Sequence, residues 1–133
     1  MKAYIAGTLS TKEEREFLHK IDDLCKKYRL ETFLPHRDVG LWKSYSDLKE
    51  IAKKDLQGFR NCRLLIANLN GFGVSSGTAW EIGYAYANKI FVIGIKTDRK
   101  VKDSIQEMSA ILVGTTKIVT SFKNLEKEIK KLI

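Results

Sequence analysis

The sequence predicts an α/β fold in which one parallel sheet is covered by helices on both faces. Short, continuous apolar runs of strand length alternate with longer segments whose apolar residues recur at helical spacing. The runs lack the alternation of a half-exposed strand, which is typical of parallel strands buried on both faces. No repeat or interdomain linker divides the 133 residues, so we expect one domain over residues 1–133.

The first half of the chain alternates strand, helix, strand and helix. The first apolar run ends at Gly7, and Thr11 with Glu14 three residues later matches the capping box of a long amphipathic helix. The second run stops at Pro35, because a proline disfavours helical conformation in the residue before it. The expected elements are a strand at 3–6, a helix capped by residue 11 and running to 28, a strand at 31–34 and, after a polar loop, a helix at 47–59.

The second half continues the alternation. The third and fourth strands are continuously apolar, and a Gly/Ser-rich loop, 70–76, follows the third. The expected elements are strands at 64–69, 90–95 and 117–120, helices at 78–88 and 122–132, and a helical or partly helical segment at 101–113. With right-handed crossovers, this order closes as a flavodoxin-like, doubly wound five-stranded parallel sheet in a three-layer sandwich.

The composition excludes several classes of protein. The chain has 24 Lys and Arg against 16 Asp and Glu, a formal net charge of +8. Most of the excess lies in Lys-Lys pairs on helical stretches, without interleaved aromatic residues on which bases could stack, so we expect a solvated surface and no nucleic-acid partner. The apolar runs are far shorter than the roughly 20 residues of a membrane span. Met1 and Lys2 lead straight into a strand, so we expect no signal peptide, no membrane contact and a cytoplasmic location.

The cysteines do not indicate a metal site. Cys25 and Cys62 lie far apart in helix-like segments, with no CxxC partner and no histidine at metal spacing. We expect two buried thiols, no disulfide and no bound metal.

Doubly wound sheets bind ligands beyond the carboxyl ends of their strands, where the winding reverses. We therefore expect one site, built from the loops after the first three strands. Three features converge there: the glycine turn after Tyr4, where backbone N–H groups can meet an anion; the Gly/Ser-rich loop, which opens a helix with Glu81 in its first turn; and Asp55, late in the preceding helix. Two carboxyls that meet beside a sugar can act as nucleophile and general acid.

Each carboxyl also has a simpler interpretation. An acid in a first helical turn is favoured by the helix dipole and needs no further role, which would explain Glu81. Asp55 follows two lysines and could be a solvated surface charge. Spacing alone leaves both interpretations open.

Four segments together resemble the nucleoside 2-deoxyribosyltransferase family, over residues 2–116. They are Tyr-Ile-Ala-Gly at 4–7, Leu-Pro-His-Arg-Asp at 34–38, Lys-Asp-Leu at 54–56 and, most specifically, Gly-Thr-Ala-Trp-Glu-Ile-Gly-Tyr-Ala at 77–85. The family includes base-exchanging transferases and 2'-deoxynucleoside 5'-monophosphate N-hydrolases, and both have the flavodoxin-like sheet. The resemblance implies that Glu81 attacks the anomeric carbon of the deoxyribose, that Asp55 protonates the leaving base and that Tyr4 holds Glu81 by a hydrogen bond. It implies no metal and no organic cofactor.

Two positions favour the hydrolase branch. The transferases carry an Asp six residues before the nucleophile and an Asn in the later helical segment, whereas this chain has Ser75 and, in the matching stretch, Ser109. The hydrolases resemble it at both positions and use the serines to contact phosphate, the later one from a neighbouring subunit. An Asp would repel a phosphate that a serine hydroxyl and helix-start N–H groups would bind.

The resemblance also implies a pocket and an assembly. Other residues expected to contact substrate, near the sugar or phosphate or near the base, are Gly7, Thr8, Leu9, Ser10, His36, Asp38 and Gly77. Trp42 and Tyr45 could close over the base or simply pack the loop, and Trp80 is expected in the core or in a subunit contact. We expect a homodimer or higher homo-oligomer that acts on a small-molecule deoxynucleotide or deoxynucleoside. Base exchange between deoxynucleosides and a non-catalytic nucleotide-binding module are the alternatives.

Overall fold

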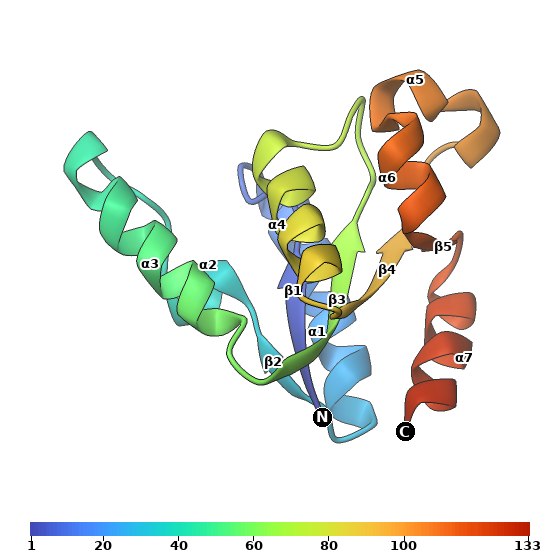
Figure 1. Ribbon diagram of the computed structural model, residues 1–133, viewed down its shortest axis with the longest axis horizontal. Coiled ribbons are helices and arrows are strands. Elements are labelled where there is room, and N and C mark those ends of the chain that lie inside the picture. The colour runs from blue at the N-terminus through green and yellow to red at the C-terminus, as the bar shows by residue number, and fades with distance from the viewer.

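Five short apolar segments pair into one parallel sheet with the strand order β2-β1-β3-β4-β5 (Figure 1). The computed structural model describes residues 1–133. The strands are β1 (Lys2–Ala6), β2 (Glu31–Phe33), β3 (Cys62–Asn68), β4 (Phe91–Ile95) and β5 (Lys117–Val119). The chain passes from β1 to β2 on one side and then crosses to β3 on the other, so the winding reverses at β1. The predicted flavodoxin-like, doubly wound fold is confirmed.

Helices cover both faces of the sheet and make three layers (Figure 1). One buried core joins the sheet to α1 and α7, and a second joins it to the end of α3, α4, α5 and α6. Two cores form because successive side chains of a strand point to opposite faces, as Tyr4 and Ile5 do. The helices are α1 (Lys12–Lys27), α2 (Pro35–Asp38), α3 (Leu48–Gly58), α4 (Ser76–Ala87), α5 (Ile105–Met108), α6 (Ala110–Thr115) and α7 (Phe122–Leu132), with 3-10 turns η1 (Tyr45–Asp47) and η2 (Val101–Asp103).

Helix α3 extends away from the sheet and is anchored only at its C-terminal end (Figure 1). Gly58 and the following Phe59 are buried, whereas Leu48 and Leu56 remain 39% and 40% exposed. The anchor needs glycine, because a Cβ at Gly58 would lie 2.4 Å from the ring of Phe33. Most of the helix is therefore left without a core partner on the side that faces α4.

The structure corrects the expected elements in three places. The polar loop after Pro35 contains the short helix α2, since proline is well suited to a first helical position. The segment 101–113 is divided into η2, α5 and α6, because Ser109 has φ 73° and ψ 144°, which no helix accommodates. Cys62 begins β3 and is not in a helical segment. Both cysteines are free and buried, as expected.

A buried lysine fixes the loop between β3 and α4. Lys96 is 1% exposed; its Nζ donates to the carbonyl of Leu69 at 3.1 Å and pairs with Asp98 Oδ1 at 2.9 Å. Asp98 Oδ2 in turn accepts from the backbone N–H of Gly71 at 2.8 Å. A buried ammonium is tolerated only where such partners satisfy it, so this arrangement ties the start of the loop to the end of β4. The loop leads directly into α4.

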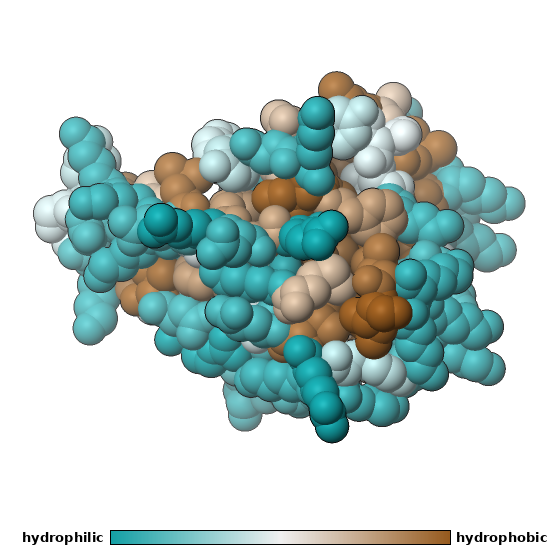
Figure 2. Space-filling view, turned by 60° about the horizontal axis from the view of Figure 1, so that its bottom comes forward, coloured by the Kyte–Doolittle hydropathy of each residue, from teal (hydrophilic) through white to brown (hydrophobic).

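Hydrophilic side chains cover most of the periphery of the face seen in Figure 2, around a smaller apolar area near its centre. None of the helices combines the length and the apolarity that crossing a bilayer requires. No cluster of three or more His, Cys, Asp or Glu side chains is placed to hold a metal ion.

Candidate active site

A cavity lies at the carboxyl end of β1, bordered by the loops that follow the first three strands. It has two compartments with volumes of about 270 Å³ and about 500 Å³. The smaller, which we call the apolar compartment, is also lined by Tyr4, Ala52, Leu56, Phe59 and Trp80. The larger, which we call the polar compartment, is also lined by Thr8, Ser10, Arg15, Gly40, Leu41, Trp42, Ile51, Ser75 and Thr78. The wall common to both consists of Gly7, Leu9, Pro35, Asp55, Gly77 and Glu81.

Tyr4 and Glu81 are joined by a hydrogen bond between β1 and α4. The hydroxyl of Tyr4 donates to Glu81 Oε2. The ring of Tyr4 is fully buried and stacks on Phe59, with 3.9 Å between centroids and 6° between planes. Burial and the charge of Glu81 raise the pKa of Tyr4, so the hydroxyl stays protonated and remains a donor. The carboxyl of Glu81 is thus held by a donor that packing has fixed.

Glu81 lies in the second turn of α4, whereas we expected it in the first. Ser75 is the N-cap and its Oγ accepts from Thr78 N at 3.3 Å, so the helix begins at Ser76 and not at Thr78. The helix dipole acts mainly in the first turn and does not account for an acid at this position. Burial raises the pKa of Glu81, the Tyr4 hydrogen bond lowers it and the charge of Asp55 raises it again, with a net value of about 7.

Asp55 extends from α3 into the same cavity. Its Oδ1 is buried without a hydrogen-bond partner, and burial raises the pKa of its carboxyl. A solvated surface charge would have neither property, so that interpretation of Asp55 does not hold. The charge of Asp55 raises the pKa of Glu81, so the ionisation of the two carboxyls is coupled.

Glycines shape the wall between the compartments. A Cβ at Gly7 would lie 2.7 Å from Leu18 Cδ2 and 3.1 Å from Asn68 Cβ, so only glycine permits this turn. At Gly77 a Cβ would meet nothing within 4 Å, because this side of α4 faces open space. The backbone of the first turn of α4 is therefore accessible from the cavity.

Four residues with hydroxyl side chains line the polar compartment. Thr8 and Ser10 follow β1, and Ser75 precedes α4, where its Oγ lies 2.8 Å from Thr78 Oγ1. Arg15, near the start of α1, also lines this compartment, and its Nη1 donates to the carbonyl of Leu9 at 2.7 Å. Neutral hydroxyls, one cation and free N–H groups at a helix start are suited to an anionic group.

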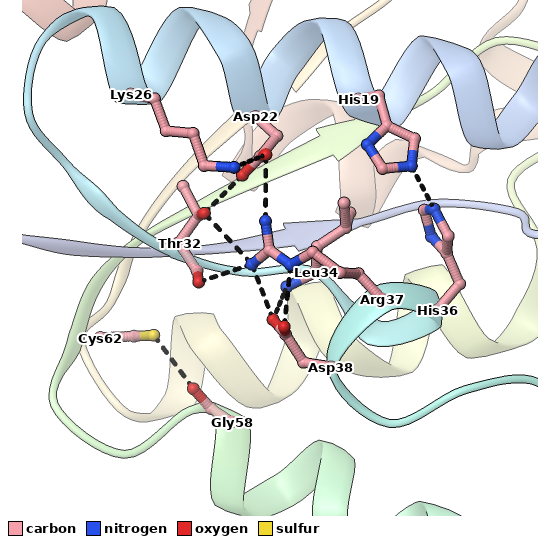
Figure 3. Close-up of polar contacts among 10 residues, drawn as sticks. All are labelled: His19, Asp22, Lys26, Thr32, Leu34, His36, Arg37, Asp38, Gly58 and Cys62. Atoms are coloured by element: carbon pink, nitrogen blue, oxygen red, sulfur yellow. Dashed lines mark hydrogen bonds and ion pairs between the residues drawn. The ribbon is translucent and has the colours of Figure 1, made fainter.

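Three of the expected substrate contacts do not line the cavity. His36 points to α1, with its Nε2 2.9 Å from His19 Nε2, and Asp38 pairs with Arg37 at 2.8 Å and accepts from Leu34 N (Figure 3). Arg37 extends this network to the buried Asp22. Ser109 lies in the exposed turn before α6, away from the cavity of its own chain. Tyr4, Gly7, Thr8, Leu9, Ser10, Asp55, Ser75, Gly77 and Glu81 all line it.

Sequence reasoning missed several cavity residues. Trp80 is not in the core: it is 58% exposed, lines the apolar compartment and stacks on Tyr84 at 5.5 Å. Of the two aromatic residues that the sequence suggested could close over the base, Trp42 lines the polar compartment and Tyr45 does not line the cavity. Arg15 is the fourth residue of α1, and no motif in the sequence marks it as a cavity residue.

Comparisons with known proteins identify a family by sequence and a shared fold by structure. A family model described as nucleoside 2-deoxyribosyltransferase matches residues 3–124. The crystal structure of a conserved protein from Enterococcus faecalis V583 superposes with a TM-score of 0.82 and 26% identity, covering 100% of this chain and 99% of that one. A 2-deoxyribosyltransferase from Bacillus psychrosaccharolyticus has a TM-score of 0.77 and 16% identity over 95% of this chain and 90% of that one, which shows a shared fold. No protein with a curated description matches the chain in sequence.

Proposed function

Because the chain belongs to the nucleoside 2-deoxyribosyltransferase family, we propose that its cavity hydrolyses the N-glycosidic bond of 2'-deoxynucleoside 5'-monophosphates. The observation that carries the proposal is the Tyr4–Glu81 hydrogen bond beside Asp55, on the wall that both compartments share. A sugar at this wall has a nucleophile and an acid within one cavity. The phosphate then lies in the polar compartment, and the base lies against α3 beside Asp55.

The first step is a displacement at the anomeric carbon. Ionised Glu81 attacks C1' as the C1'–N bond breaks, and the proton of Asp55 passes to the departing base. The product is a deoxyribosyl ester of Glu81, reached through an oxocarbenium-like transition state. One difficult displacement is thereby divided into two easier ones.

The second step releases the sugar. Asp55, now ionised, accepts a proton from a water molecule. The oxygen of this water attacks C1' as the ester bond to Glu81 breaks. The carboxylate of Glu81 and the protonated Asp55 are restored, and deoxyribose 5-phosphate leaves. If a free base attacks in place of water, the same intermediate gives base exchange.

The reaction requires Glu81 in its ionised form and Asp55 in its protonated form. Tyr4 donates to Glu81 and so stabilises its ionised form. Asp55 Oδ1 is buried with no donor to stabilise a charge, and a bound base excludes more water from it.

The preference for monophosphates rests on the outer end of the polar compartment. Ser75 stands where an Asp would repel a phosphate dianion, and its hydroxyl lies beside the start of α4. Ser109 is the candidate second hydroxyl, donated by a partner subunit in a homodimer or larger assembly. Its backbone conformation, φ 73° and ψ 144°, lies close to a region that residues other than glycine rarely occupy, and such strain is concentrated at functional positions.

The test is chromatography of each deoxynucleoside and each 5'-monophosphate after incubation with the protein, with and without added adenine. Base release from the monophosphates, unaffected by adenine and absent in Glu81→Ala, supports the proposal. New deoxyadenosine formed from unphosphorylated donors would make the protein a transferase. Tight nucleotide binding by calorimetry without turnover would make it a binding module.

A further inference from the structure

The polar compartment is lined by one cationic side chain, Arg15, and this guanidinium has no carboxylate partner. The two other arginines with recorded contacts of the guanidinium are both ion-paired: Arg37 with Asp22 and Asp38, and Arg99 with Glu107. Arg15 makes one recorded hydrogen bond, from Nη1 to the carbonyl of Leu9, and forms no ion pair with Asp55 or Glu81 in the same cavity. Four of its five N–H donors therefore have no partner within the protein, and the residue lines the cavity.

Nothing in the fold requires a positive charge at this place. Arg15 lies in the first turn of α1, where the helix dipole favours acids such as the neighbouring Glu13 and Glu14. Its charge also disfavours protonation of His36, whose pKa is lowered mainly by burial and further by His19 and Arg15. A partly buried guanidinium without a carboxylate partner lowers the stability of the protein unless a bound anion pairs with it.

We propose that Arg15 binds the 5'-phosphate of the substrate and is the residue that selects monophosphates over unphosphorylated deoxynucleosides. The inference rests on the proposed function. A guanidinium presents parallel N–H groups that match two oxygens of one phosphate, while Nη1 remains anchored to Leu9. The hydroxyls of Ser10 and Ser75 line the same compartment and can donate to the remaining oxygen.

The test compares Arg15→Gln and Arg15→Lys with wild type, with Arg63→Gln as the matched control. Arg63 is an exposed arginine near the start of β3, at the opposite end of the sheet from the cavity, so its loss removes one charge without touching the site. We expect Arg15→Gln to raise KM for monophosphates by about 10- to 100-fold, the range for one charge-assisted hydrogen-bonding partner. The values of kcat, and KM for deoxynucleosides, should change little. Arg15→Lys should retain part of the affinity, and Arg63→Gln should behave as wild type.

A purely structural role makes a different prediction. If Arg15 only anchors Leu9, Arg15→Gln will impair cleavage of deoxynucleosides and monophosphates by the same factor, and this outcome overturns the inference. Thermal unfolding without ligand shows whether the variant is folded. Arg15→Lys keeps a donor for the Leu9 carbonyl but lacks the paired N–H groups of a guanidinium. It therefore separates loss of the hydrogen bond to Leu9 from loss of the two-point contact with phosphate.

A binding measurement distinguishes failure of this inference from failure of the proposed function. Deoxyribose 5-phosphate should raise Tm of wild type and of Arg63→Gln but not of Arg15→Gln, whether or not any substrate is turned over. If monophosphates are not cleaved and this difference is still seen, the proposed function fails and the role of Arg15 stands. If the sugar phosphate protects Arg15→Gln as well as wild type, or does not protect wild type, the assignment of Arg15 is wrong.

Discussion

Replacing Tyr4 by phenylalanine isolates the hydrogen bond that holds Glu81. The substitution removes only the hydroxyl that donates to Glu81 Oε2. The ring of phenylalanine can keep the stack on Phe59, 3.9 Å away, so the core should be preserved. Burial and the charge of Asp55, which both raise the pKa of Glu81, are unchanged, and the hydrogen bond that lowers this pKa is lost.

The size and sign of the effect follow from this change. A hydrogen bond to a charged group contributes about 1.5–3 kcal/mol, and 1.36 kcal/mol corresponds to about one pKa unit. The pKa of Glu81, about 7 in the wild type, should therefore rise in Tyr4→Phe by about 1 to 2 pH units. Since Glu81 must be ionised to attack, the acidic limb of the rate profile moves to higher pH. At neutral pH the ionised fraction falls from about a half to between about a tenth and about a hundredth.

The assay is the single-turnover rate of base release, measured from about pH 5 to about pH 9. Tyr86→Phe is the control, because Tyr86 is an exposed tyrosine on α4 with no recorded hydrogen bond from its hydroxyl. Tyr4→Phe should lose most activity at neutral pH and recover part of it in alkali, while Tyr86→Phe should follow the wild type. A uniform loss at every pH, with the acidic limb unmoved, would refute the argument that Tyr4 sets the ionisation of Glu81.

Three further predictions concern the same site. Because the pKa of Glu81 is raised in the folded state, its ionisation lowers the stability of the protein as pH rises from about 4.5 to about 7. In urea unfolding, Glu81→Gln should therefore be more stable than wild type at pH 8, by up to about 3 kcal/mol, and equally stable near pH 4. Equal stability at both pH values would contradict this prediction. Asp55→Asn should slow base release by about 10²- to 10⁴-fold, and least for bases that leave without protonation; a uniform effect across leaving groups would argue against an acid at Asp55. Ser109→Gly and Ser109→Ala both delete the hydroxyl, so both should raise KM for monophosphates. Only the glycine variant, which tolerates a φ of 73°, should raise the free energy of unfolding, by about 1–3 kcal/mol. An unchanged KM in both variants would exclude the hydroxyl from the site.

Much of the fold could be predicted from local pattern. All five strands were expected close to their observed positions, and the helix expected at 122–132 agrees with the observed bounds of α7, Phe122–Leu132. The capping box at Thr11 is present as expected, with both of its hydrogen bonds. These features can be predicted from the sequence because burial of a strand or helix face requires apolar residues at a regular spacing. The break at Ser109 was not legible, since a single residue with positive φ leaves no trace in an apolar pattern.

The residues of the site could be named from the sequence, but their grouping was decided by the tertiary structure. Motif and resemblance pointed to Glu81 and Asp55, yet the hydrogen bond from Tyr4 to Glu81 joins residues 77 positions apart and exists because β1 and α4 meet. His36 and Asp38 belong to a matching motif, but His36 turns toward α1 and Asp38 pairs with Arg37, whereas Arg15, which no motif marked, lines the cavity. Sequence specifies which side chains must be buried along each element. Which side chains then share one cavity depends on where the packed helices direct them, and that is settled only when the sheet and both of its cores have formed.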